Sequence, residues 1–376
     1  MSRTSPNVAV LFGGPSPEHD VSVLTGLQAA RALLDAEKIG EIHALYWTKG
    51  GTWFEVPASL EASAFADGLP EHRRALDLVA GTPGGFVIRP GRIWTRQRPI
   101  AIDVAVLCCH GGPGEDGSLQ GALDCAGVSY TGPSAASAAL GMDKLATSGV
   151  LGTAGIPVLP RLALSESTAE PTFPGPYIVK PRFGGSSIGI DVVKDFATAR
   201  ARMSSNAHLW RGAVIEPYRD DLFDLQVAVK TYPQLSLSAI ERPLVRDETA
   251  EILDYADKYA GGEGMASAPR ELPAQVSDTL RRDLRSITTD AASLLGARGV
   301  NRIDFLTDGE RLYVNEINTI PGSLARHLFI DPPLSFSSLL LDLIDEAFER
   351  PAMTFSSAGA DGSVLREAGN IAAKLA

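Results

Sequence analysis

Short apolar runs alternate with amphipathic stretches through the first third of the chain, and glycine-rich turns separate them. Three of the runs have the length and apolar character of buried strands: 8–12, 42–47 and 102–109. Apolar residues at helical spacing follow the first and third runs and predict helices over about 19–34 and 118–125. Strands that lead through glycine turns into helices are typical of α/β domains, so an α/β domain is expected here.

The rest of the chain carries further strands and helices between two boundary segments. The turn cluster at 130–134 ends the first domain, and residues 352–376 are expected to form a peripheral tail with one short helix. Strands are predicted at 177–180, 213–218 and 225–231. Helices are predicted at 134–151, 277–295 and 334–350.

Residues 299–322 combine a predicted β-hairpin with a group of charged and amide side chains. Two runs of β-branched, aromatic and aliphatic residues flank a polar Asp-Gly dipeptide, which is typical of a hairpin turn. Arg302 and Asp304 share a strand face, as do Glu316 and Asn318, because strand side chains alternate. Mg²⁺ prefers oxygen ligands, usually one or two carboxylates together with substrate phosphates, so this hairpin could hold a magnesium ion and a phosphate.

The turn of this hairpin decides whether its acids can meet. A strict two-residue turn would place Asp304 and Glu316 on opposite faces of the ribbon. One extra residue restores the parity, so an odd-numbered loop or a β-bulge is predicted. An ordinary surface hairpin with charged residues on its wet side is the alternative.

Two glycine turns lie where the first and third predicted strands end. After the first, Glu18 stands at a helix N-terminus, either as an acid that complements the helix dipole or as a ligand for a substrate ammonium. Its position alone favours the dipole. After the second, His110 lies beside Glu115 and Asp116 at the sheet edge where ligands of open α/β sheets gather; a structural hydrogen bond is the alternative. The first turn lacks the later glycines of a dinucleotide fingerprint.

Residues 177–190 join a strand ending in Lys180 to a Gly-Gly-Ser-Ser loop and a further strand. Glycine lets the backbone approach a ligand closely, and N–H groups and serine hydroxyls donate to phosphate oxygens, so a phosphate-binding lid is predicted. A flexible hairpin tip is the alternative. Residues 254–264 are polar and glycine-containing, which predicts a second mobile loop.

Composition and net charge restrict the classes of binding partner that are expected for this protein. The 376 residues suffice for two or three domains, and 44% hydrophobic with 21% charged residues is typical of a globular protein. The net charge of 34 − 45 = −11 argues against nucleic acid or an anionic membrane as partner. No signal peptide pattern is visible, and the longest apolar run falls short of the ~20 residues that span a bilayer, so a cytoplasmic location is expected.

The cysteines suggest no metal or disulfide framework. Cys108, Cys109 and Cys125 are odd in number and lack metal-ligand spacing, and adjacent cysteines rarely bridge each other. All three are predicted to be reduced thiols in the core.

Six blocks, taken together, resemble the ATP-grasp enzymes and, within them, the D-alanine-D-alanine ligase family. The blocks are LFGGPSPEHDVS at 11–22, CHGGPGEDGSLQGALDCAGVSYTGPS at 109–134, Met142-Asp143-Lys144, VKPRFGGSSIG at 179–189, DYADKY at 254–259, and RIDF with NEINTIPG. Any single block is weak, but their order and spacing match over about residues 7–350, so the set is highly specific.

The resemblance implies an α/β (α+β) ATP-grasp fold with three domains and a tail. They are an N-terminal, Rossmann-like parallel-sheet domain for the first substrate, a central subdomain with the phosphate lid, a C-terminal subdomain with the metal and oxyanion sites, and the tail: 1–132, 133–216, 217–350 and 351–376. It also implies ATP, two Mg²⁺ ions for which Mn²⁺ could substitute, and small amino acids as substrates. A homodimer is expected by analogy with similar ligases.

The resemblance further implies roles for single residues. Lys144 and Lys180 would touch the nucleotide phosphates, Ser186 and Ser187 would belong to the lid, Glu216, Pro217 and Tyr218 would meet adenine, and Asp224 takes the place of a ribose-binding Glu. The metal ligands would be Asp304, Glu316 and Asn318. Substrate-binding residues would be Glu18 at the first ammonium, His110 near the first carboxylate, and Lys258. Tyr259 and Ser186 would link to Glu18, and Arg302 with the Gly322 N–H would form the oxyanion hole.

One departure from the family concerns the second amino acid. Five residues beyond Gly322 the family usually has Ser followed by Met or Leu, which helps to hold the acceptor carboxylate, whereas this chain has His327-Leu328. The segment before the last long helix is also shorter. Three hypotheses remain: a D-alanine-D-alanine ligase, a related ligase with another acceptor, or a nucleotide-binding regulatory protein without turnover. The intact Arg302, Asp304, Glu316 and Asn318 set speaks against the third, and Tyr259 favours an amine over a hydroxyl acceptor.

Overall fold

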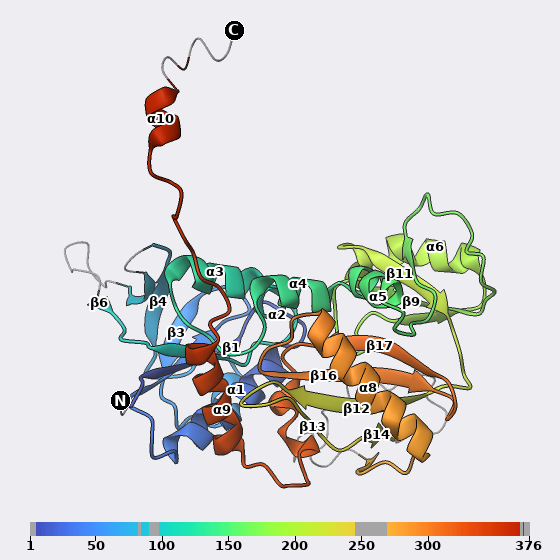
Figure 1. Ribbon diagram of the computed structural model, residues 1–376, viewed down its shortest axis with the longest axis horizontal. Coiled ribbons are helices and arrows are strands. Elements are labelled where there is room, and N and C mark those ends of the chain that lie inside the picture. Colours follow the sequence, from blue (N-terminus) through green and yellow to red (C-terminus); the bar gives the residue numbers. More distant parts are fainter. Residues whose placement is uncertain (1–4, 82–83, 90–97, 245–268, 369–370, 372–376) are drawn as a thin grey trace.

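The computed structural model describes residues 5–81, 84–89, 98–244, 269–368 and 371. Within them lie three main sheets and a two-stranded ribbon. In Figure 1 the N-terminal sheet lies on the left, the central sheet on the upper right and the C-terminal sheet on the lower right. This arrangement of mixed sheets agrees with the predicted fold class.

The N-terminal sheet has seven strands in the order β6-β5-β4-β3-β2-β1-β7. Strand β1 (Val8–Gly13) pairs in parallel with β2 (Ile42–Trp47) and β7 (Val104–Leu107), which confirms the three predicted strands. The remaining strands extend the sheet in antiparallel fashion: β3 (Trp53–Val56), β4 (Arg74–Val79), β5 (Gly85–Ile88) and β6 (Arg98–Pro99). The sheet is therefore parallel only around β1, where the ligand edge is expected.

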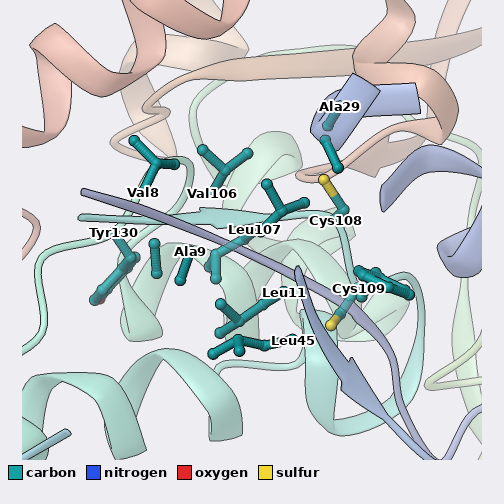
Figure 2. Close-up of a cluster of buried hydrophobic side chains, with 14 of the residues drawn as sticks. Val8, Ala9, Leu11, Ala29, Leu45, Val106, Leu107, Cys108, Cys109 and Tyr130 are labelled. Carbon is teal, nitrogen blue, oxygen red and sulfur yellow. The ribbon is translucent and has the colours of Figure 1, made fainter. Parts of the chain in front are cut away.

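Helices cover this sheet and connect it to the last part of the chain. The helices here are α1 (His19–Leu34), η1 (Ala62–Phe65), α2 (Gly112–Glu115) and α3 (Ser118–Ala126). The late helix α9 (Phe336–Glu349) packs against α1 and β7, so residues far apart in sequence share one core. Figure 2 shows part of this core around Val8, Leu11, Val106 and Leu107.

The central region contains an antiparallel sheet in the order β10-β9-β11-β8. Its strands are β8 (Leu162–Leu164), β9 (Tyr177–Pro181), β10 (Asp191–Val193) and β11 (Ala213–Pro217). Its helices are α4 (Ala135–Met142), α5 (Lys144–Thr153), α6 (Phe196–Ser205) and η2 (Ala207–Leu209).

The single helix predicted over 134–151 was wrong, because Asp143 divides it. Asp143 has an extended backbone with φ −83° and ψ 97°, and its Oδ1 accepts from the N–H groups of Leu145 and Ala146 at 3.1 Å, which caps α5. Arg182 also donates to both carboxylate oxygens of Asp143. Lys144 is therefore the first residue of a new helix, not a mid-helix side chain.

The C-terminal sheet runs in the order β13-β12-β16-β17 and is antiparallel. Its strands are β12 (Phe223–Lys230), β13 (Ser236–Leu237), β16 (Val300–Thr307) and β17 (Leu312–Asn318), with the ribbon β14 (Arg242–Pro243) and β15 (Arg270–Glu271) beside them. The helices are α8 (Asp278–Leu294), η4 (Gly322–Leu328), α9 and α10 (Ser363–Glu367). The tail that carries α10 projects away from the body (Figure 1), as the prediction of a peripheral tail requires.

Two of the three cysteines confirm the prediction of core thiols, and the third does not. Cys108 and Cys109 are buried, free and directed to opposite faces of the sheet (Figure 2). Burial raises the pKa of Cys109 to about 12, so its thiol stays protonated at neutral pH. Cys125 is free but exposed near the end of α3, where its side chain points to solvent instead of the core. Among the described residues no helix is both long and apolar enough to cross a membrane.

Candidate functional site

A cavity of about 420 Å³ lies between the central and C-terminal sheets. Most of the predicted nucleotide and metal residues line it. They are Lys144, Lys180, Ser187, Glu216, Pro217, Tyr218, Asp224, Asp304 and Glu316. Residues from α5, β9, β11, β12, β16 and β17 thus meet in one place, although the chain separates them by up to 172 positions.

The hairpin of β16 and β17 contains the predicted β-bulge. Asp304 lies directly opposite Glu316, but the next pair is Phe305 with Val314, so Asn315 is the extra residue. A bulge of this kind restores the parity that a regular ladder would lose. The two carboxylates therefore share one face of the ribbon, as predicted, instead of lying on opposite faces.

Cationic and amide groups surround the two carboxylates. Arg302 binds Asp304 in a bidentate ion pair, with Nε–Oδ1 of 2.7 Å and Nη2–Oδ2 of 2.8 Å. Asn318 donates to Asp304 Oδ2 at 3.1 Å, and Lys144 Nζ lies 3.3 Å from Glu316 Oε2. Two carboxylates and a neighbouring amide, next to lysines that could bind phosphate, fit the hard-oxygen preference of Mg²⁺. No group of three His, Cys, Asp or Glu side chains suited to a metal occurs within the described ranges, so the predicted set depends on Asn318.

A buried ion pair cluster forms part of the cavity wall. Glu216 is fully buried, and its two carboxylate oxygens pair with Arg161 Nε at 2.7 Å and Lys180 Nζ at 3.0 Å. Burial alone would raise the pKa of Glu216, but Lys180 and Arg161 outweigh it and hold the pKa below its ordinary value. The Glu216 carboxylate is therefore ionised, and Lys180 is held at the cavity by two partners, since it also donates to Asn315 Oδ1 at 3.1 Å.

Arg161 is a residue that the sequence did not reveal. Besides Glu216, its guanidinium donates to the carbonyl oxygens of Lys144 at 2.6 Å and of the bulge residue Asn315 at 3.1 Å. One side chain thus ties α5, β11 and the bulge together. Its partners lie 17, 55 and 154 positions away, so no local motif could have identified it.

We expect Arg161→Met to lower the free energy of unfolding by about 3 kcal/mol, because removing one partner of a buried ion pair typically costs roughly 3–5 kcal/mol. Lys180 still pairs with Glu216, which places the loss at the lower end of that range. Arg161→Lys keeps the charge but cannot reach all three oxygens, and its loss should be intermediate. Urea denaturation measures both, and equal stability of all three proteins would contradict the assignment.

The predicted lid reaches across to the N-terminal domain. Ser186 donates to Glu18 Oε1, and a Cβ placed on Gly185 would lie 3.0 Å from Glu18 Oε2. Ser186 and Ser187 have positive φ values of 53° and 59°, which non-glycine residues rarely adopt. Lys144 Nζ donates to the carbonyl oxygen of Gly184 in the same loop. Two predicted site residues, Lys144 and Glu18, therefore hold the loop.

The position of Glu18 distinguishes between its two predicted roles, an acid that complements the helix dipole and a ligand for a substrate ammonium. Glu18 precedes the first turn of α1, but its side chain makes no capping hydrogen bond to the helix. Its carboxylate instead faces the lid through Ser186. A carboxylate that faces the 183–187 loop and makes no capping bond is better placed to bind a ligand than to cap a helix, which favours the substrate interpretation.

His110 and Glu115 are buried where the second glycine turn meets the segment before Gly322. Nδ1 of His110 lies 2.7 Å from the carbonyl oxygen of Ile320, and Nε2 lies 2.8 Å from Thr25 Oγ1. Burial lowers the pKa of His110 to about 4, so its ring is neutral at pH 7. Burial, with Glu18 nearby, raises the pKa of Glu115 to about 7. Protein groups thus occupy both ring nitrogens of His110, and its predicted contact with the first substrate's carboxylate stays a prediction.

His327 lies beside a buried acid. Its Nε2 is 3.6 Å from Glu241 Oε2, and the other oxygen of Glu241 pairs with Arg270 at 2.9 Å. Burial alone would raise the pKa of Glu241, but His327, Arg270 and Arg302 hold it below its ordinary value. The departure noted in the sequence therefore places an imidazole next to an ionised carboxylate. Lys258, Tyr259 and the predicted loop 254–264 lie outside the described residues.

Comparisons with known proteins give one consistent family. The profile described as D-ala D-ala ligase N-terminus matches residues 7–133, and the profile described as D-ala D-ala ligase C-terminus matches residues 156–345. Similar curated proteins include the D-alanine-D-alanine ligases of Pelodictyon phaeoclathratiforme and Corynebacterium aurimucosum. The first is 33% identical, with 91% of this chain and 98% of the relative covered, and the second is 32% identical, with 93% and 100% covered.

Solved structures agree on the fold. The D-alanine-D-alanine ligase from Coxiella burnetii is 24% identical, with a TM-score of 0.73 and coverage of 93% of this chain and 95% of that one. The VanG D-Ala:D-Ser ligase from Enterococcus faecalis is also 24% identical, with a TM-score of 0.72 and coverage of 91% and 99%. At these identities the structural likeness concerns the fold alone.

Proposed function

The chain belongs to the D-alanine-D-alanine ligase family and is an ATP-dependent ligase of that type, and we propose the following roles for its residues. The reaction joins two D-amino acids through an acyl phosphate and gives dipeptide, ADP and phosphate, and dipeptides of this kind serve peptidoglycan synthesis. The observation that carries the proposal is the meeting of Asp304, Glu316, Lys144 and Lys180 around one cavity.

The first chemical problem is the carboxylate of the first amino acid, which is a poor electrophile. Transfer of the γ-phosphoryl group from ATP to this carboxylate releases ADP and gives an acyl phosphate, from which phosphate is a good leaving group. Lys144 and Lys180 neutralise charge on the phosphates, and the serines of the lid donate to phosphate oxygens. Asp304, Glu316 and Asn318 would hold Mg²⁺, which, when bound, supplies positive charge to the terminal phosphates.

The adenosine end of ATP occupies the part of the cavity formed by β11 and β12. Glu216, Pro217 and Tyr218 meet the adenine, and Asp224 accepts from the ribose hydroxyls in place of the family's Glu. The closed arrangement of the 183–187 loop excludes water, which would otherwise hydrolyse the acyl phosphate.

The second step is attack by the amine of the second amino acid. Glu18 holds the first substrate's ammonium, and Ser186 with Tyr259 connects Glu18 to the attacking amine. Arg302 and the Gly322 N–H donate to the oxyanion of the tetrahedral intermediate, and one such donor is typically worth roughly 3 kcal/mol. Lys258 also contacts substrate in this proposal.

Two candidates remain for the acceptor, the second substrate of the reaction. We propose that His327 controls which acceptor is used. The pair of His327 with Glu241 stands where the family usually has a small serine hydroxyl. D-alanine is the first candidate as acceptor, and another amino acid or amine of a specialised peptide pathway is the second.

We expect His327→Ser to change acceptor preference more than ATP affinity, because the imidazole lies beside Glu241 and does not line the nucleotide cavity. Initial rates over a set of D-amino acids, with ATP varied separately, measure both effects. A shift in the KM for ATP alone would show that His327 acts elsewhere.

A phosphate-release assay over single and paired amino acids, with the product identified by mass spectrometry, tests the acceptor. Release with D-alanine alone supports the first candidate, and release only with a mixed pair supports the second. Release with no pair would contradict the proposal and favour a regulatory nucleotide-binding protein.

The domain division, the location and the oligomeric state are further proposals. We propose the domain division 1–132, 133–216, 217–350 and 351–376, a cytoplasmic location and a homodimer. Light scattering on the purified protein tests the oligomeric state, and a monomer at assay concentration would refute the dimer.

A further inference from the structure

The Pro321-Gly322 segment is enclosed by a ring of hydrogen bonds from the N-terminal domain. The carbonyl oxygen of Ile320 lies 2.7 Å from His110 Nδ1, and His110 Nε2 lies 2.8 Å from Thr25 Oγ1. The backbone N–H of Ser323 donates to the same Thr25 Oγ1 at 3.0 Å. The ring thus starts at Ile320 and returns to the chain at Ser323, three residues later.

The direction of each hydrogen bond in this ring follows from the chemistry of the groups. A carbonyl oxygen only accepts, so Nδ1 of the neutral His110 ring carries the proton and donates to Ile320. Nε2 then accepts, and the Thr25 hydroxyl must donate to it. That hydroxyl oxygen still has a lone pair for the Ser323 N–H. Every donor and acceptor in the ring is therefore satisfied in only one arrangement.

Further contacts hold the same segment. The N–H of Ile320 donates to Glu115 Oε1 at 3.0 Å, and the other oxygen of Glu115 accepts from the N–H of Gly111 at 2.9 Å. Ser323 Oγ donates to Gln28 at 2.7 Å. Both backbone polar groups of Ile320 are thus bound by side chains of one glycine turn.

The turn that follows Gly322 has a backbone conformation that is unfavourable by itself. Ser323, Leu324 and Ala325 have φ values of 47°, 49° and 49°, so three consecutive non-glycine residues are left-handed. L-residues disfavour this conformation, and surrounding contacts must maintain it. The turn begins directly after Gly322, and the hydrogen bonds at Ile320 and Ser323 hold the chain on both sides of that residue.

We propose that Thr25 and His110 are positioning residues that orient the Gly322 N–H toward the oxyanion. This inference rests on the proposed role of Gly322. In it the positioning role replaces the predicted contact of His110 with the first substrate's carboxylate, and neither side chain touches substrate; both act through the backbone of residues 320–323. The ring therefore belongs to the second chemical step, amine attack, and leaves formation of the acyl phosphate unaffected.

Thr25→Val and Thr25→Ser form a matched pair for the test. Valine has the shape of threonine but no hydroxyl, whereas serine keeps the hydroxyl. Single-turnover quench-flow measures ADP formation and dipeptide formation separately in each variant. We expect Thr25→Val to slow dipeptide formation about tenfold or more, since small misplacements of a catalytic group can cost up to ~10²-fold, with ADP formation close to the wild-type rate. Thr25→Ser should form both products close to the wild-type rates.

Two substitutions of His110 keep the proposal testable if Thr25→Val fails to fold. The amide nitrogen of Asn occupies roughly the place of Nδ1, and that of Gln roughly the place of Nε2. The ring predicts that His110→Asn, which can still donate to Ile320, forms dipeptide faster than His110→Gln. The KM for the first amino acid should change little in either variant.

Several outcomes would overturn the positioning role. Thr25→Val with wild-type dipeptide formation is one, and an equal slowing of ADP and dipeptide formation is another. A His110→Gln variant that outperforms His110→Asn, or a raised KM for the first amino acid in both, would instead indicate a substrate contact at Nε2. A wild-type protein that forms neither ADP nor dipeptide would refute the proposed function itself, a result that these variants cannot produce.

Discussion

Glu316→Gln is expected to abolish turnover while the fold is retained. The substitution keeps the shape of the side chain but removes the charge that faces Asp304 across the bulge and Lys144 across the cavity. A single group that stabilises transition-state charge is typically worth roughly 10²–10³ in kcat, and loss of a metal ligand should reach at least the upper end of that range. Phosphate release under saturating ATP and amino acid measures the effect.

The neighbouring Glu310 supplies the control for this substitution. It lies exposed in the turn of the same hairpin, so Glu310→Gln removes an identical charge away from the cavity. We expect wild-type turnover from Glu310→Gln and the same melting temperature in all three proteins. Retained activity in Glu316→Gln would remove this residue from the metal site.

Glu18→Gln is expected to lower kcat/KM for the first amino acid by roughly a hundredfold or more, with a much smaller effect on the KM for ATP. Removing one member of a buried charge pair typically costs about 2–5 kcal/mol. The substitution also weakens the hydrogen bond from Ser186, so the lid loses its anchor on the N-terminal domain. Steady-state kinetics with each substrate varied in turn separate the two effects.

Asp20→Asn is the matched control for Glu18→Gln. Asp20 is an exposed acid in the first turn of the same helix and pairs with Lys49 at 3.2 Å. If Glu18 served only the helix dipole, both substitutions would have similar small effects on stability and none on kinetics. Equal kinetics of the two variants would therefore contradict a substrate role for Glu18.

The elements that depend on local pattern were predictable from the sequence. The periodicity of residues 19–34 gave the bounds of α1, and the parity argument at Asp304 and Glu316 required the irregularity that Asn315 supplies. Parity is a local property of a hairpin, since turn length and strand alternation together fix which side chains share a face. The shared face of Asp304 and Glu316 could therefore be predicted from the sequence alone.

The features that depend on distant partners were not predictable. Apolar residues continue on both sides of Asp143, which suggested one helix; Asp143 instead caps α5, and its carboxylate is also held by Arg182, 39 positions away. Arg161 is an isolated cation in the sequence and becomes the anchor of the bulge only in three dimensions. Likewise, His110 stands at a predicted ligand edge, yet both of its ring nitrogens bind groups of α1 and the segment before Gly322.

The central claim is that Asp304 and Glu316, brought opposite each other by one bulge, hold the divalent cation that faces the phosphates of ATP. Mn²⁺ binding followed by electron paramagnetic resonance, with a non-hydrolysable ATP analogue present, tests it most directly. The account predicts that Asp304→Asn and Glu316→Gln each bind Mn²⁺ much more weakly than the wild type and Glu310→Gln. Wild-type Mn²⁺ affinity and stoichiometry in both cavity variants would contradict it.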